Sequence, residues 1–210
     1  MTETPVNIAV LVSGNGTNFQ AIIDAIEAGR IANGRIACLV SNRPDAFALE
    51  RAKRHNIPAL ILQHNGFANR QAYDTALVAL LREHGVHLVV LAGFMRILSP
   101  VMVEAFPNAI MNIHPALLPS FPGLDAQQQA LDYGVRYSGC TVHFVDCGTD
   151  TGPVILQAVV PVLADDTAET LSQRIHGEEH RIYSEAVNLF CSGSLQVVGR
   201  RVLIKPALSA

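Results

Sequence analysis

Asn112 and His114 are the residues whose types and spacing most directly suggest catalysis. Residues two apart in an extended strand share a face, so the amide and the imidazole should emerge side by side. Pro115 has no N–H to donate to a sheet, so the strand should end with both groups at its rim. An amide donor beside an imidazole suits a carbonyl that becomes an oxyanion while a proton moves. The alternative, two polar residues that merely end a strand, stays open on these residues alone.

A glycine-containing turn, Ser13 to Asn18, joins the first apolar run directly to a helix. Exposed N–H groups at the start of such a helix form an anion site. The turn lacks the Gly-Lys-Ser/Thr of a Walker A loop and the spacing of G-x-G-x-x-G, which argues against dinucleotide binding. Its position at the first turn of an α/β sheet favours a phosphate site over an ordinary turn in which Thr17 or Asn18 caps the helix.

Two later loops are further candidates. The apolar loop 93–98 could pack a flat aromatic ligand on Met95 and Leu98, although such a loop is more often core. Asp150, followed by Thr151-Gly152-Pro153, is first of all typical of a turn, but a carboxylate near an imidazole would hold that ring for proton transfer. The sequence does not place Asp150 near His114, and His143 reads as a strand residue.

The stretch 176–180 matches H-x-x-E-H, the zinc pattern of one metallopeptidase group. His176 and His180 share a helix face because they are four residues apart. A zinc site also needs a third ligand and a fitting fold. The favoured interpretation of this stretch is a solvated or ligand-facing turn. A zinc hydrolase built on His176, Glu179 and His180 is the alternative hypothesis.

Apolar runs and amphipathic segments alternate through the first two-thirds of the chain, which predicts an α/β fold with a doubly wound, mostly parallel sheet and helices on both faces. After Pro122 the pattern predicts a short helix, two paired strands, a long helix opened by a capping box at 166–169, and a terminal hairpin. No linker divides the chain, so a single domain over residues 1–210 is expected. The predicted strands are 6–12, 36–41, 59–62, 88–92, 109–113, 137–145, 154–162, 195–198 and 202–204, and the predicted helices are 19–26, 45–54, 73–81, 125–133 and 166–190.

The composition excludes several classes of protein. A chain of 210 residues with 50% hydrophobic and 16% charged residues can bury a substantial core, and a net charge of -3 gives no basic footprint for nucleic acid. No apolar stretch is long enough to span a membrane, and residues 1–6 lack the features of an export signal. The four cysteines are scattered without C-x-x-C, as in a reduced protein, so a cytoplasmic location is expected.

Taken together, four blocks resemble the folate-dependent formyltransferases that act on 5-phosphoribosylglycinamide in purine synthesis. The blocks are V-S-G-N-G-T-N, A-G-F-M-R-I-L-S-P, N-I-H-P-A-L-L-P, and G-C-T-V-H-F-V with Asp150 and Gly152-Pro153 after it. The similarity extends from Val6 to Val198. It implies a Rossmann-like formyltransferase fold, direct transfer of a formyl group from 10-formyltetrahydrofolate to the glycinamide amine, and no metal. The implied partners are these two small molecules, without nucleic acid or membrane, in a monomer or weak homodimer.

The resemblance also assigns roles to residues. Asn112 would donate to the oxyanion, His114 would stabilise it and relay a proton, and Asp150 would hold His114 charged. The resemblance assigns the ribonucleotide to Gly16, Thr17, Asn18, His176, Gly177, Glu178 and Glu179. It assigns the folate to Arg70, Met95, Arg96, Ile97, Leu98, Asn112, Asp146, Cys147, Gly148, Thr149 and Asp150.

The sequence departs from the family in two places. Family members often carry histidine near Asp125 and Gln127, and an aliphatic residue usually stands where Thr149 does. The altered segment around Asp125 prompts a third hypothesis, a catalytically silent module that binds folate or nucleotide. The chain is shorter than the formyltransferases that act on methionyl-tRNA, and those enzymes lack the G-N-G turn.

Overall fold

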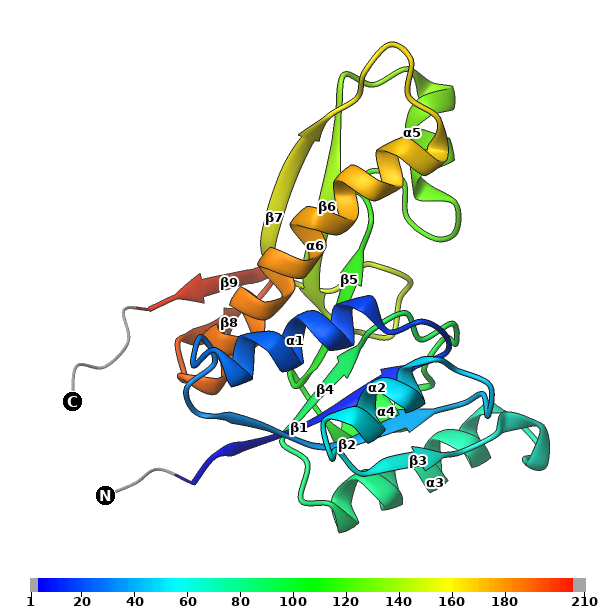
Figure 1. The fold of residues 1–210 in the computed structure, drawn as a ribbon, viewed down its shortest axis with the longest axis vertical. Helices are drawn as coiled ribbons and strands as arrows, with labels where there is room; N and C mark the ends of the chain where they lie inside the picture. Colours follow the sequence, from blue (N-terminus) through cyan, green and yellow to red (C-terminus); the bar gives the residue numbers. More distant parts are fainter. Residues whose placement is uncertain (1–3, 206–210) are drawn as a thin grey trace. The chain divides into compact units, whose positions relative to one another are not determined.

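A computed structural model describes residues 4–205 of the chain (Figure 1). Residues 1–3, on which the expectation about an export signal partly rests, lie outside the described residues. The backbone packs as two compact units divided between Met111 and Asn112. The prediction of a single domain over residues 1–210 stays a prediction, and each unit is described by itself.

The first unit alternates strands and helices. Four of its strands pair in parallel in the order β3-β2-β1-β4. This arrangement follows from apolar runs such as β1, in which the five residues from Ile8 to Val12 are fully buried. Its elements are β1 (Val6–Val12), α1 (Thr17–Glu27), β2 (Gly34–Ser41), α2 (Ala48–Arg54), β3 (Ala59–Ile61), the 3-10 turn η1 (His64–Gly66), α3 (Arg70–Glu83), β4 (Leu88–Leu91) and α4 (Pro100–Ala105).

The second unit begins within β5 (Ile110–His114) and holds a mixed arrangement of strands. The antiparallel pair β6 and β7 carries the long helix α6, shown in orange in Figure 1, against it. The strand order here is β5-β6-β7-β9-β8. The remaining elements are α5 (Ala126–Tyr133), β6 (Tyr137–Phe144), β7 (Val154–Pro161), α6 (Ala168–Cys191), β8 (Leu195–Val198) and β9 (Arg201–Ile204).

The predicted fold class is confirmed, because the sheet is mixed but mostly parallel and helices lie on both sides of it. Every strand and helix predicted from the sequence is present within a few residues of the expected ends. Helix α4 was not predicted, although Ser99 followed by Pro100 is a recognisable helix start. No helix among residues 4–205 has both the length and the apolar character to cross a membrane.

The helices α6 and α5 begin in different ways. The capping box of α6 is formed by Thr167 and Thr170, one residue later than expected, because the Asp166 carboxylate instead pairs with Arg174 at 2.8 Å. Asp125 does precede α5, but its backbone is left-handed (φ 55°) and its side chain makes no capping hydrogen bond. Gly134, with φ 79°, ends that helix.

Candidate active site

Strand β5 presents Asn112 and His114 as the sequence predicts. The strand ends at His114, immediately before Pro115, and the two residues share a face because they are two positions apart. Asn112 is partly exposed, whereas the His114 side chain is almost completely buried. Thr141 holds the segment that follows: its hydroxyl donates to the Ala116 carbonyl (2.7 Å) and accepts from the Leu118 amide (3.0 Å).

The loop between β6 and β7 brings Asp150 to His114. The Asp150 Oδ2 atom lies 3.3 Å from Nδ1 of His114 and accepts a hydrogen bond from the Gly123 amide at 2.9 Å. Gly152 allows the loop to close against β6, since a Cβ there would come within 1.8 Å of the Phe144 carbonyl oxygen. Asp150 itself is left-handed (φ 53°), a conformation that costs energy in most residues and clusters at functional sites.

His143, which the sequence analysis treated as a strand residue, lies beside Asn112. Burial lowers the pKa of His143 below its usual value, although the Phe144 carbonyl and the Asp150 carboxylate act in the opposite direction. In the neutral ring, Nδ1–H donates to the Phe144 carbonyl (2.9 Å), so Nε2 is an acceptor. The Asn112 amide donates to that Nε2 at 3.2 Å. Asp150 Oδ1 also lies 3.7 Å from the same nitrogen, a contact that is an ion pair only when His143 is protonated.

This contact fixes the direction of the Asn112 side chain. One N–H of its amide is used on His143, and the second N–H remains available for a ligand carbonyl. A donor held in advance by its neighbour is what oxyanion stabilisation requires. In the sequence, the block G-C-T-V-H-F-V is the signal that could have marked His143 as a functional residue. The strand pattern does not indicate that His143 contacts Asn112.

Both ring nitrogens of His114 face acceptors in this structure. Nε2 lies 2.8 Å from the Phe121 carbonyl oxygen, and Nδ1 lies beside Asp150. A ring with a proton on each nitrogen satisfies both neighbours. A substrate that uses Nε2 must take the place of the Phe121 carbonyl. The cluster of amide, imidazole and carboxylate can thus polarise a carbonyl and pass a proton near it.

The turn expected to bind phosphate is built around Gly16 and Arg51. Gly16 has φ +72°, and a Cβ there would lie 2.7 Å from the Ala48 Cβ of α2, so glycine is required for backbone and packing alike. Arg51, on α2, donates through Nε to the Asn15 carbonyl and through Nη2 to the Asn15 side chain, each at 2.9 Å. Sequence reasoning missed Arg51 because nothing local connects it to the turn.

Gly16 occupies the N-cap position of α1, with Thr17 and Asn18 in the first turn of the helix. Because Gly16 occupies the N-cap position and has no side chain, neither Thr17 nor Asn18 is the N-cap residue of this helix. The N–H groups in the first turn of a helix suit an anion.

The other residues assigned to folate in the first unit lie at the ends of its elements. Met95 and Ile97 are 72% and 63% exposed in the loop after β4, so they are not the core residues of the alternative reading. The Met95 amide donates to the Ser13 hydroxyl at 2.9 Å, which ties this loop to the end of β1. Arg96 lies over the Tyr73 ring at 4.5 Å, and Leu98 is partly buried. Arg70 is the first residue of α3 and is exposed.

In the second unit, the residues 146–149 form the turn that leads to Asp150. The Asp146 carboxylate accepts from the Gly148 amide (3.0 Å) and the Thr151 hydroxyl (2.6 Å). Cys147 and Thr149 are exposed, and all four cysteines are free thiols. These local bonds of the Asp146 carboxylate shape the turn.

The stretch 176–180 lies within α6. His176 is half exposed, Glu178 pairs with Arg181 at 2.7 Å, and the buried Glu179 lies 3.9 Å from His176. Gly177 has open space around it. Among residues 4–205, no three His, Cys, Asp or Glu side chains come close enough together to hold a metal ion. The third ligand that the zinc alternative needs is therefore not provided by this part of the chain.

Comparison with known proteins connects this geometry to a family. The formyl transferase family matches residues 6–187, which include the residues of the cluster. The chain belongs to the formyl transferase family. A curated relative, phosphoribosylglycinamide formyltransferase of Escherichia coli (strain K12), is 46% identical over 191 residues, 91% of this chain and 90% of the relative.

Other relatives of this formyl transferase are longer or have solved structures. The chain is 44% identical to the trifunctional purine biosynthetic protein adenosine-3 of Drosophila melanogaster over 204 residues, and it spans 15% of that protein's length. The crystal structure of glycinamide ribonucleotide transformylase 1 from Symbiobacterium toebii matches with a TM-score of 0.94 and 54% identity, covering 96% of this chain and 95% of that one.

Proposed function

We propose that this formyl transferase transfers a formyl group from 10-formyltetrahydrofolate to the amine of 5-phosphoribosylglycinamide in purine biosynthesis. The observation that carries the proposal is the cluster of Asn112, His114 and Asp150 in a chain that is close in sequence and length to phosphoribosylglycinamide formyltransferases. The folate donor follows from the family resemblance. We further propose that the enzyme works in the cytoplasm, without nucleic-acid or membrane partners, as a monomer or weak homodimer.

In the proposed mechanism the glycinamide amine attacks the formyl carbon directly. The second N–H of Asn112 donates a hydrogen bond to the formyl oxygen as it becomes an oxyanion. His114 donates a hydrogen bond from Nε2–H to the same oxygen, after the substrate displaces the Phe121 carbonyl. Asp150 keeps the other nitrogen of His114 engaged. The proton lost by the amine is then relayed by His114, held by Asp150, to the departing folate nitrogen. No formyl-enzyme forms.

The substrates are assigned to the remaining residues of the proposed site. The ribonucleotide phosphate is assigned to the turn with Gly16, Thr17 and Asn18, whose N–H groups and helix dipole favour an anion. The residues 176–179 are assigned to the rest of that substrate. Arg70, residues 95–98 and residues 146–150 are assigned to the folate, and the exposed Met95 and Ile97 offer apolar surface for its ring.

A turnover assay with both substrates tests the function. Formation of the formylated ribonucleotide in step with folate release supports it, whereas tight binding of either substrate without product would favour the silent module. The variants His114→Ala and Asn112→Ala test the roles: loss of the proton-transfer group typically costs about 10²–10⁴ in rate, and loss of the oxyanion donor roughly 2.7–4 kcal/mol. A near-normal kcat in either variant would remove that residue from the chemistry.

A further inference from the structure

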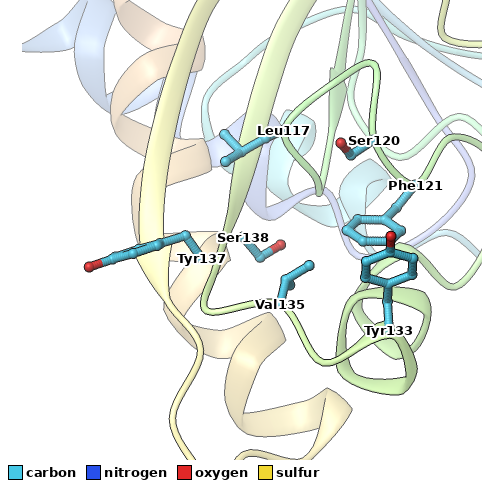
Figure 2. Close-up of a pocket in the computed structure, with 7 residues that line it drawn as sticks. All are labelled: Leu117, Ser120, Phe121, Tyr133, Val135, Tyr137 and Ser138. Atoms are coloured by element: carbon cyan, nitrogen blue, oxygen red, sulfur yellow. The ribbon is translucent and has the colours of Figure 1, made fainter.

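The second unit holds a pocket that the proposed mechanism does not use. It has a volume of about 330 Å³ and lies between the segment after β5, helix α5 and the start of β6 (Figure 2). None of its lining residues belongs to the proposed catalytic, folate or ribonucleotide sets. They are Leu117, Ser120, Phe121, Tyr133, Val135, Tyr137 and Ser138.

The lining has an unsatisfied polar group at its centre. Ser138 is 2% exposed, and its hydroxyl has no hydrogen-bond partner among residues 4–205. In Figure 2 this hydroxyl points toward the space bounded by Phe121, Tyr133 and Val135. A buried hydroxyl without a partner is unfavourable, so a ligand that donates to it or accepts from it gains a hydrogen bond the protein lacks.

The rest of the lining is aromatic, apolar and uncharged. Phe121 and Tyr133 meet edge to face, with ring centroids 5.8 Å apart, yet Tyr133 is 80% exposed. Exposed rings beside an open pocket provide a surface for another flat ring. Because no charged side chain lines the pocket, a charged ligand would lose its hydration without compensation. A volume near the lower end of small-molecule sites suits one or two rings.

Phe121 connects this pocket to the catalytic cluster. Its ring forms part of the pocket wall, while its backbone carbonyl accepts the hydrogen bond from Nε2 of His114 at 2.8 Å. Its backbone is also left-handed (φ 54°), which leaves few alternative conformations. An occupant that packs on the ring therefore acts on the carbonyl that a substrate must displace.

We propose that this pocket binds a neutral, flat aromatic heterocycle of one or two rings with a hydrogen-bonding N–H or O–H, and that the occupant holds the Phe121 carbonyl on His114. Ser138 takes the polar group and Tyr133 packs on the ring. The effect on turnover rests on the proposed function of His114, but binding itself does not.

Indole is a suitable probe, and because the chain has no tryptophan, the fluorescence of indole reports its binding directly. We expect saturable binding to the full chain, weakened about three- to tenfold by Ser138→Ala through the lost hydrogen bond. Tyr133→Ala should weaken binding at least as much. Phe47→Ala is the matched control, since that aromatic ring is 46% exposed and does not line the pocket, and this variant should bind indole like the parent.

The connection to His114 is measured separately by NMR of the histidine rings, which requires no substrate. We expect the His114 signals, identified with His114→Ala, to shift as indole saturates the pocket. Absence of saturable binding, or equal weakening by Phe47→Ala and Tyr133→Ala, would overturn the site. Saturation that leaves the His114 signals unmoved would overturn the coupling. Neither result depends on whether the protein transfers formyl groups, so failure here is distinguishable from failure of the proposed function.

Discussion

His143 is expected to set the rate of formyl transfer without touching the substrate. It accepts the Asn112 hydrogen bond at 3.2 Å, and that bond directs the remaining N–H of the amide. A neutral hydrogen bond of this kind contributes about 1 kcal/mol, which corresponds to about fivefold in rate. Complete loss of an oxyanion donor costs roughly 2.7–4 kcal/mol and sets the upper limit. Removing the acceptor should therefore lower kcat by at least about fivefold and by no more than about a hundred- to a thousandfold.

Two conservative variants separate this role from a general packing effect. His143→Gln keeps a polar group near the position of Nε2, where its carbonyl oxygen can accept from Asn112. His143→Asn keeps only a group near Nδ1, where its amide can still donate to the Phe144 carbonyl. We expect steady-state kinetics to show near-normal kcat for His143→Gln and the full loss for His143→Asn, with little change in KM for either substrate.

A double-mutant cycle with Asn112→Ala provides the decisive comparison. If His143 acts through Asn112, adding His143→Asn to Asn112→Ala should cost almost nothing further, because residues that act as one unit are not additive. Fully additive losses, or equal losses in His143→Gln and His143→Asn, would refute the reasoning. Circular dichroism of each variant establishes that a lower kcat is measured on folded protein.

The remaining predictions concern the first turn and the response to pH. Gly16→Ala should lower the free energy of unfolding by about 2–4 kcal/mol, since it adds left-handed strain and a close contact with Ala48, whereas Gly14→Ala meets nothing within 4 Å and should be nearly neutral by urea unfolding. Arg51→Lys cannot make both bonds to Asn15 and should raise KM for the ribonucleotide several-fold while the dissociation constant of the folate stays unchanged; equal losses of both affinities would count against it. The pKa of His143 is lowered in the folded protein, so the unfolded chain takes up the proton first. Stability from this group is complete above about pH 6.5 and is lost as the pH falls toward the folded pKa, by at most about 1.4 kcal/mol per pH unit. Urea unfolding at neutral and mildly acidic pH should show this loss of stability in the parent, and the His143→Gln variant should lack it.

Much of the fold could be predicted because its signals are local. The buried strand 6–12 is a continuous apolar run, and α1 follows an apolar spacing that matches one helix face. Pro115 ends β5 because it lacks an N–H, and the two-residue period of a strand is enough to place Asn112 beside His114. Helix α4 was missed because it is only six residues long, too short for a clear period.

The partners of these residues were decided only by the tertiary structure. Asp150 reaches His114 because a tight loop closes where Gly152 meets the Phe144 carbonyl, and no spacing in the sequence encodes that approach. Likewise, Arg51 reaches the first turn only when α2 packs against it. Burial lowers the pKa of His143 and so favours the neutral ring that accepts from Asn112, and no sequence pattern carries this property of its surroundings. The sequence alone determined which groups stand at the end of β5, and long-range packing determined which atoms they face.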